Sequence, residues 1–123
     1  MRKYLFRGKN AKGEWEYGDL ITGDQYGPYI RNRALIYVGV DSETVGQFTG
    51  LKDCDGREIY EGDVIASSFA DYKAVVEFRN GAFIAVTGPV DTYQALYGVL
   101  RLKGLRVIGN VHDNSDLLEA THD

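Results

Sequence analysis

Hydrophobic and polar positions follow strand-like patterns along most of the chain. Polar and aromatic residues alternate over residues 14–17, which predicts a strand with both rings on one face. A continuous apolar run at residues 34–38 has the length and the β-branched and aromatic content of a buried strand. Further strands are predicted from the apolar residues at 4–6 and at 106–111. The pattern therefore predicts an all-β fold with little helix.

The clearest local signal is a hairpin. Two β-rich runs, residues 74–79 and 82–86, flank the pair Asn80-Gly81. This pair readily adopts positive φ at both central positions of a type I′ turn. We therefore predict a two-residue hairpin centred on Asn80 and Gly81.

The C-terminal third has a less regular pattern. Apolar spacing after a cap at Asp91 or Thr92 predicts a short helical turn at residues 92–97, followed directly by a strand. Asn114 or Ser115 is predicted to cap a last turn.

An internal echo links residues 6–21 to residues 48–65. Phe-x-Gly, Lys-[Asn/Asp]-x-[Lys/Asp]-Gly and Gly-Asp-[Leu/Val]-Ile recur in the same order. In each copy a strand ends at a glycine, a polar loop closes on a second glycine, and a Gly-Asp corner leads into an aliphatic strand. We interpret the echo as a duplicated strand-loop-strand unit, with chance recurrence of turn motifs as the alternative. The expected determinants of the fold in these copies are Gly8, Gly13, Gly18, Asp19, Gly50, Asp55, Gly56, Gly62 and Asp63.

Composition limits the function classes. The 123 residues are enough for one domain, and no Ser- or Pro-rich linker divides them. With 14 Lys and Arg against 18 Asp and Glu, the net charge of −4 argues against a general polyanion binder. The single cysteine excludes a disulfide framework, and no apolar run approaches the roughly 20 residues that span a bilayer. We expect no membrane association.

No catalytic or metal-binding constellation can be identified. The acidic stretch at residues 53–58 fails the calcium-loop pattern in both possible registers, so we interpret it as a turn. The Gly-Asp corners could supply paired carboxylates, but backbone capping by each Asp is the favoured interpretation. Cys54 and His112 lack any flanking signature of a nucleophile and its base. We therefore predict no enzyme activity, no cofactor and no metal.

Basic residues interleave with tyrosines, which raises two binding hypotheses. Small β-barrels with such faces can bind single-stranded nucleic acid through phosphate neutralisation and base stacking. The opposing interpretation places the rings in the core and the charges on the rim, and the negative net charge favours it. Tyrosine also suits protein–protein contacts or self-association. The candidate binding residues are Arg31, Arg33, Tyr37, Arg101, Lys103 and Arg106.

The second copy of the echo carries a family resemblance. Residues 45–53 and 55–65 resemble the central signature of the YopX family of phage and prophage proteins. The hairpin with Asn80-Gly81 and residues 107–114 match in the same order, whereas residues 22–41 and 88–104 match nothing recognisable. The resemblance implies that the matching residues act as determinants of the fold, with Ile59, Val64 and Ile65 in a core and Tyr60 packed at a strand end. Gly109 and Asn110 are further determinants of this kind.

The resemblance also implies a fold and a setting. It predicts a soluble, mostly β protein with an SH3-like barrel, spanning residues 1–123 as one domain and carrying no catalytic residue. The implied setting is a bacteriophage or prophage and the bacterial cytoplasm. The expected function is that of a non-enzymatic accessory protein that binds protein or itself. The alternative is a small β-barrel that binds single-stranded nucleic acid.

Overall fold

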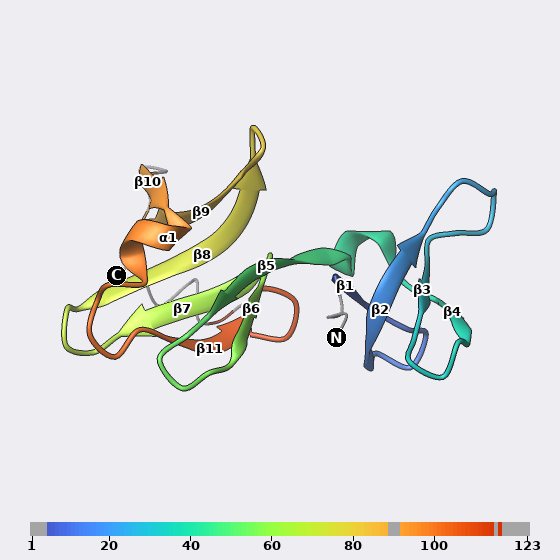
Figure 1. Ribbon diagram of the computed structural model, residues 1–123, viewed down its shortest axis with the longest axis horizontal. Helices are drawn as coiled ribbons and strands as arrows, with labels where there is room; N and C mark the ends of the chain where they lie inside the picture. Colours follow the sequence, from blue (N-terminus) through green and yellow to red (C-terminus); the bar gives the residue numbers. More distant parts are fainter. Residues whose placement is uncertain (1–4, 89–91, 115, 117–123) are drawn as a thin grey trace. The chain divides into compact units, whose positions relative to one another are not determined.

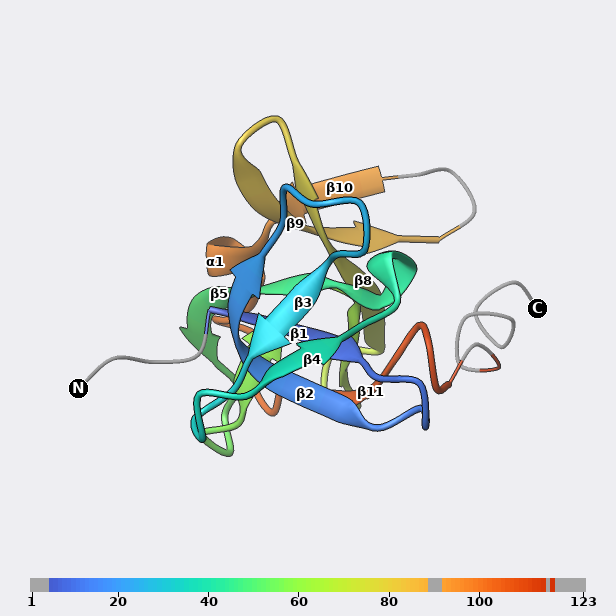
Figure 2. The same ribbon diagram turned by 90° about the vertical axis from the view of Figure 1, so that its right-hand side faces the viewer.

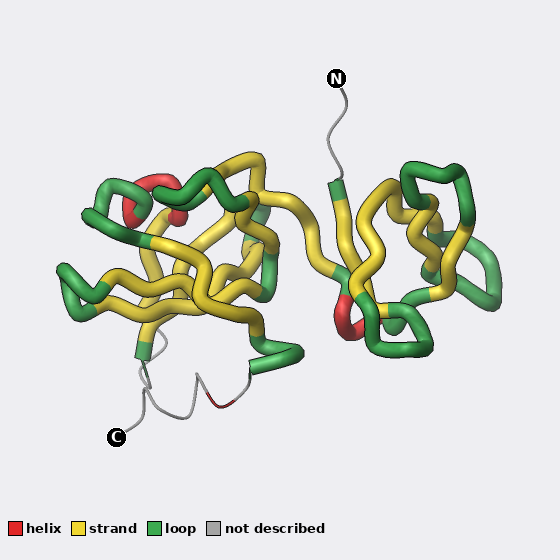
Figure 3. The backbone as a smooth tube through the Cα atoms, turned by 90° about the horizontal axis from the view of Figure 1, so that it is seen from below, coloured by secondary structure: helices red, strands yellow, loops and turns green. Residues whose placement is uncertain are grey.

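The computed structural model describes residues 5–88, 92–114 and 116. Strands make up most of the described backbone (Figure 3). The chain divides into two compact units, Met1–Phe48 and Thr49–Asp123. Their boundary falls inside one strand, so no linker composition marks it in the sequence. The prediction of one domain over residues 1–123 remains a prediction.

The first unit contains a meander of four antiparallel strands, to which the first half of β5 is added (Figure 1). The order across the sheet is β4-β3-β2-β1-β5. A single turn of 3₁₀ helix, η1, precedes β5, and Ile30 of β3 is fully buried. These elements are β1 (Phe6–Lys9), β2 (Trp15–Ile21), β3 (Tyr29–Arg31), β4 (Tyr37–Gly39), η1 (Ser42–Thr44) and β5 (Gly46–Lys52).

The second unit contains a five-stranded antiparallel sheet in the order β10-β9-β8-β7-β11, with β6 beside the second half of β5. A four-residue helix, α1, follows β10. The elements are β6 (Glu58–Tyr60), β7 (Asp63–Ser67), β8 (Tyr72–Arg79), β9 (Ala82–Thr87), β10 (Thr92–Ala95), α1 (Leu96–Val99) and β11 (Arg106–Asn110). The prediction of an all-β fold with little helix is confirmed, whereas the SH3-like barrel remains a prediction.

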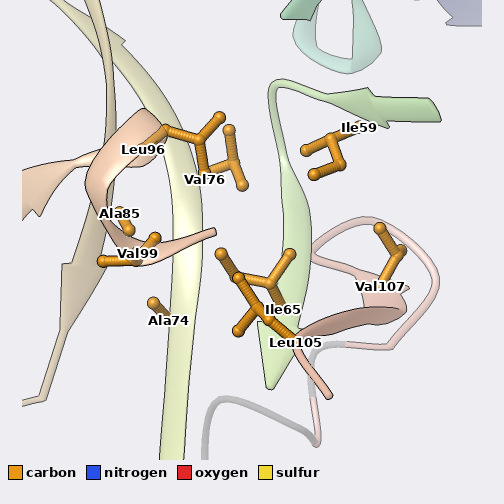
Figure 4. Packing of buried hydrophobic residues seen from close by; sticks show 9 residues of the cluster. All are labelled: Ile59, Ile65, Ala74, Val76, Ala85, Leu96, Val99, Leu105 and Val107. Carbon is orange, nitrogen blue, oxygen red and sulfur yellow. The ribbon is translucent and has the colours of Figure 1, made fainter. Parts of the chain in front are cut away.

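Aliphatic side chains from strands and helix form the core of the second unit (Figure 4). Ile59 and Ile65 are fully buried, as expected from the sequence, and Val64 is fully buried on β7. Tyr60 is 3% exposed at the end of β6, where the sequence predicts it to pack. The helix contributes because its two buried residues, Leu96 and Val99, lie three positions apart on one face. This cluster comprises Ile59, Ile65, Ala74, Val76, Ala85, Leu96, Val99, Leu105 and Val107.

The predicted hairpin is confirmed. Strands β8 and β9 pair in register from Val75 opposite Val86 to Arg79 opposite Ala82. Asn80 and Gly81 have φ of 51° and 82°, the left-handed values that a type I′ turn requires. Here the local signal alone decides the structure.

One loop geometry recurs three times, and the sequence echo shows only two of the copies. The first residue of each loop is Asn10, Asn32 or Asp53, and one side-chain oxygen accepts N–H bonds from residues two and four positions later, at 2.9–3.1 Å. In all three loops the backbone N–H of the first residue donates to the carbonyl of the residue four positions later, and its own carbonyl accepts the N–H of the residue three positions later, at 2.9–3.0 Å. Three-residue hairpin loops of this kind place their last residue in the left-handed region.

The residue in that left-handed position differs among the three loops. Gly13 and Gly56 occupy it with φ of 78° and 82°, and Leu35 occupies it with φ of 64°. The left-handed region brings Cβ close to the following carbonyl oxygen. This contact costs a residue other than glycine about 1–2 kcal/mol of conformational energy. Leu35 therefore holds a strained backbone that the equivalent glycines avoid.

Two sequence predictions are wrong. Residues 34–38 do not form a buried strand, because Leu35 lies in the loop, Tyr37 begins β4, and both side chains are exposed. Residues 92–97 do not form a helical turn, because β10 extends along β9 and the helix begins only at Leu96. The sequence also predicts a strand directly after the helical turn, whereas the next strand of the described chain is β11. Ser115 lies outside the described residues.

The strain at Leu35 predicts that replacing this residue by glycine stabilises the protein. Leu35→Gly should raise the free energy of unfolding by roughly 0.5–1 kcal/mol, because strain relief exceeds the extra chain entropy of glycine when unfolded. Gly13→Ala should lower it by about 1 kcal/mol at the equivalent position, where added side-chain atoms meet nothing. Urea unfolding followed by fluorescence of Trp15, the single tryptophan, reports on this unit. A destabilised Leu35→Gly variant would contradict the prediction.

A second prediction concerns the Asp53 carboxylate. It accepts N–H bonds from Asp55 and Arg57 within its loop and from Val107 on β11, all at 2.9 Å. Asp53→Ala should lower the free energy of unfolding by about 2–4 kcal/mol, because the buried Val107 N–H loses its charged acceptor.

The matched control is Asp55→Ala, because that carboxylate is 61% exposed and lies 3.6 Å from Arg106. An exposed ion pair contributes about 0–1 kcal/mol. Urea unfolding followed by circular dichroism distinguishes the two variants. Equal losses of stability would show that Asp53 does not join the loop to β11.

Candidate protein-interaction surface

Three large apolar side chains are exposed side by side along the chain at the end of the first sheet. Leu35 is 72% exposed, Ile36 is 57% exposed and Tyr37 is 56% exposed. They lead into β4, which ends the strand order of its sheet (Figure 1). We call Leu35, Ile36, Tyr37 and Gly39 the β4 edge. From the sequence, Tyr37 is a candidate binding residue, but the whole run at residues 34–38 is predicted to form a buried strand. Asn32 gives a loop signal three residues before Leu35.

The backbone of β4 presents hydrogen-bonding groups on its outer side. Ile36 and Val40 bond toward β3, through Asn32 N–H to the Ile36 carbonyl at 3.0 Å and Val40 N–H to the Pro28 carbonyl at 3.1 Å. Antiparallel pairing alternates with a period of two residues, so Tyr37 and Gly39 direct their N–H and C=O groups outward. Within the described part of the chain, no strand pairs with this outer side.

A cross-strand row of polar side chains supports Tyr37. Asp19 on β2, Arg31 on β3 and Tyr37 on β4 are consecutive register partners. The Arg31 guanidinium donates to Asp19 at 2.7 Å. This hydrogen bond raises the pKa of Arg31, and a hydrogen bond with Tyr37 raises it further. The row places Tyr37 opposite Arg31, and the arginine is charge-paired within the sheet.

The predicted basic residues fall into two groups in different units. Arg31 and Arg33 lie in the first unit, and Arg101, Lys103 and Arg106 lie in the second. The Lys103 ammonium is 4.9 Å from the Phe69 ring centroid, a cation–π contact. Arg106 lies 3.6 Å from the Asp55 carboxylate. Because Arg31 is paired with Asp19, intramolecular contacts engage cations of both groups.

The second unit carries a groove of about 560 Å³ beside α1 and β10. Its lining is mostly apolar, with Gln94 and Tyr72 as polar members. The Tyr72 hydroxyl is buried and accepts or donates no hydrogen bond among the described residues. Burial raises the pKa of this phenol, which keeps it neutral. The groove is lined by Ala70, Tyr72, Gln94, Ala95, Gly98, Val99 and Leu102.

The predicted determinants of the fold occupy structural positions. Gly18 lies against the Arg31 carbonyl, where any Cβ would collide, and Gly8 approaches Val40 closely. Gly50 has φ of 83° inside β5, and Gly109 follows a register irregularity in β11. The Asn110 side-chain oxygen accepts N–H bonds from the two residues at 112 and 113, at 3.0 and 2.9 Å.

The two Gly-Asp corners differ. Gly62 has φ of 94° in a turn between β6 and β7, whereas Gly18 lies within the continuous strand β2. The Asp63 carboxylate, 2% exposed, accepts the Tyr60 N–H at 2.7 Å, which is the backbone capping that the sequence predicts. The Asp19 carboxylate instead pairs with Arg31. Each carboxylate is therefore bonded within its own unit.

The described residues contain neither a metal-binding cluster nor a helix that could span a membrane. Among residues 5–88, 92–114 and 116, no three His, Cys, Asp or Glu side chains gather closely enough to hold a metal ion. None of the helices in the described segments has the length and apolar character to cross a membrane.

Comparison with known proteins identifies the family. No curated protein matches this sequence. Among solved structures, the chain is similar to the crystal structure of protein EF1440 from Enterococcus faecalis, with a TM-score of 0.60 and 23% identity. The alignment covers 93% of this chain and 96% of that one, a likeness of fold. The family model for YopX protein matches residues 4–119. The chain therefore belongs to the YopX family.

Proposed function

We propose that this protein is a non-enzymatic binding module that recognises another protein through the β4 edge. The observation that carries the proposal is Leu35, which is both strained and 72% exposed. Glycine serves at the equivalent positions of the two other loops, so folding alone does not require leucine there. An exposed apolar side chain in a strained loop is typical of a surface that gains its free energy from a partner.

The setting follows from the family. Its phage and prophage members suggest that the protein is encoded by such an element and acts in the cytoplasm of the bacterial host. The partner would then be a protein of the phage or of that host.

Nucleic-acid binding is the second candidate. It is favoured by the exposed basic residues beside aromatic ones, such as Lys103 next to Phe69. The net charge of −4 and the pairing of Arg31 with Asp19 weigh against it, because such affinity is largely electrostatic.

The third prediction tests the protein-binding function. Immobilised protein should capture a specific partner from phage-infected bacterial cells, and Leu35→Gly should reduce the retained amount at least tenfold while the fold stays intact. Tyr26→Ser is the matched control, because Tyr26 is 74% exposed in the same unit but belongs to the loop at the opposite end of β3 (Figure 2). Equal capture by all three proteins would remove the β4 edge from the function.

A parallel titration separates the two candidates. Fluorescence anisotropy with single-stranded DNA and RNA oligonucleotides should show no tight binding even at about 50 mM salt. Tight binding that falls steeply between about 50 and 200 mM salt would favour the nucleic-acid function instead.

A further inference from the structure

The outer side of β4 combines open backbone groups with apolar side chains. We propose that an extended segment of the partner protein adds to this side as a further strand, paired with the outward N–H and C=O groups of Tyr37 and Gly39. This inference rests on the proposed function and specifies how the partner binds. Strand addition is a common mode of peptide recognition at exposed sheet edges.

The backbone geometry of β4 matches such a strand. Because Ile36, Val38 and Val40 face β3, two N–H and two C=O groups point outward from positions two residues apart. An added strand meets its neighbour through groups at this same spacing. Open edge strands are usually shielded by short length, charges, proline or bulges; β4 is short, with three residues, but residues 37–39 contain no charge, proline or bulge.

The side chains of the β4 edge favour an apolar segment. Gly39 has open space where a side chain would stand, so a partner residue can lie against the sheet there. Tyr37 lies opposite Arg31 in the register, and Arg31 is paired with Asp19, so this row adds no uncompensated charge to the edge. Leu35 and Ile36 extend the apolar surface beyond the end of the strand.

The size of the surface decides between a segment and a second copy of the chain. A large aromatic side chain buries roughly 150–250 Å² when fully covered. Even at that size, three side chains at 72%, 57% and 56% exposure offer at most about 460 Å², against the ~800 Å² that each partner buries in a standard stable interface. The β4 edge alone is too small to hold a dimer together, and it suits a short segment that gains specificity from backbone pairing.

The experiment uses the full chain and a defined probe. The probe is a pool of short synthetic peptides with Val, Ile, Phe or Tyr at alternate positions and Ser, Thr or Gln between them. Binding of pool members is measured by fluorescence anisotropy. For the best binder, N-methylation of the backbone at alternate residues should weaken binding at least tenfold, because it removes N–H donors and keeps the side chains.

A pair of variants at one position supplies the fourth prediction. Gly39→Pro should weaken peptide binding at least tenfold, because proline removes an outward donor and is tolerated at an edge. Gly39→Ala keeps that donor and adds only a methyl group, so it should weaken binding at least fivefold less than Gly39→Pro does. Fluorescence of Trp15 shows whether each variant folds. The N-methylated peptide tests the reciprocal bonds, from peptide N–H groups to the outward carbonyls of Tyr37 and Gly39, with the unaltered protein.

Amide hydrogen exchange measured by NMR locates the added strand. Bound peptide should slow exchange of the Tyr37 and Gly39 amides at least tenfold and leave Val38 unchanged, because Val38 already faces β3. Absence of peptide binding up to millimolar concentration would overturn strand addition, as would unaffected Tyr37 and Gly39 amides. Concentration-dependent protection of these amides without peptide would assign the edge to a second copy instead.

The two proposals can fail separately. If a captured partner depends on Leu35 but leaves the Tyr37 and Gly39 amides exchanging freely, binding stands and strand addition is wrong. If capture does not depend on Leu35, the proposed function itself is wrong.

Discussion

The structure depends on one recurrent interaction, a side-chain oxygen at the start of a loop that accepts two backbone N–H groups of that loop. Asn10, Asn32 and Asp53 each provide it, and each closes a three-residue connection between antiparallel strands. In the second unit the Asp53 carboxylate also accepts the Val107 N–H on β11, so one carboxylate both closes the loop and joins it to the sheet. A small β protein has little core to define its strand register, and these bonds fix where each hairpin turns.

Features encoded within a few residues could be predicted from the sequence. Asn80-Gly81 specifies its turn through backbone conformation alone, and the prediction is confirmed. The polar loops of the echo were recognisable because Gly13 and Gly56 mark the left-handed position. The family resemblance, which rests on short local motifs, implies that Ile59 and Ile65 lie in the core, and both are fully buried.

Features that depend on distant partners could not be predicted. The third loop was hidden because Leu35 stands where glycine would signal a turn, and the apolar run then reads as a buried strand. Residues 92–95 extend as β10 because β9 offers them an edge, and this pairing outweighs their weak helical pattern. The role of Asp53 depends on Val107, which is 54 residues away in the sequence. For the candidate site, the sequence supplied Arg31 and Tyr37 but not the exposure that makes the surface.

Leu35 combines two unfavourable properties that have no common structural cause. Its backbone strain would disappear with glycine, and its exposed side chain contributes almost nothing to the core of the first unit. Asn32 already closes the loop, so the leucine is not needed to form the turn. Beside it, the N–H and C=O groups of Tyr37 and Gly39 point away from β3, and within the described part of the chain no strand pairs with them. A residue that strains the backbone and stabilises no core, at an open strand edge, is best explained by a gain that arises only when another chain covers that edge.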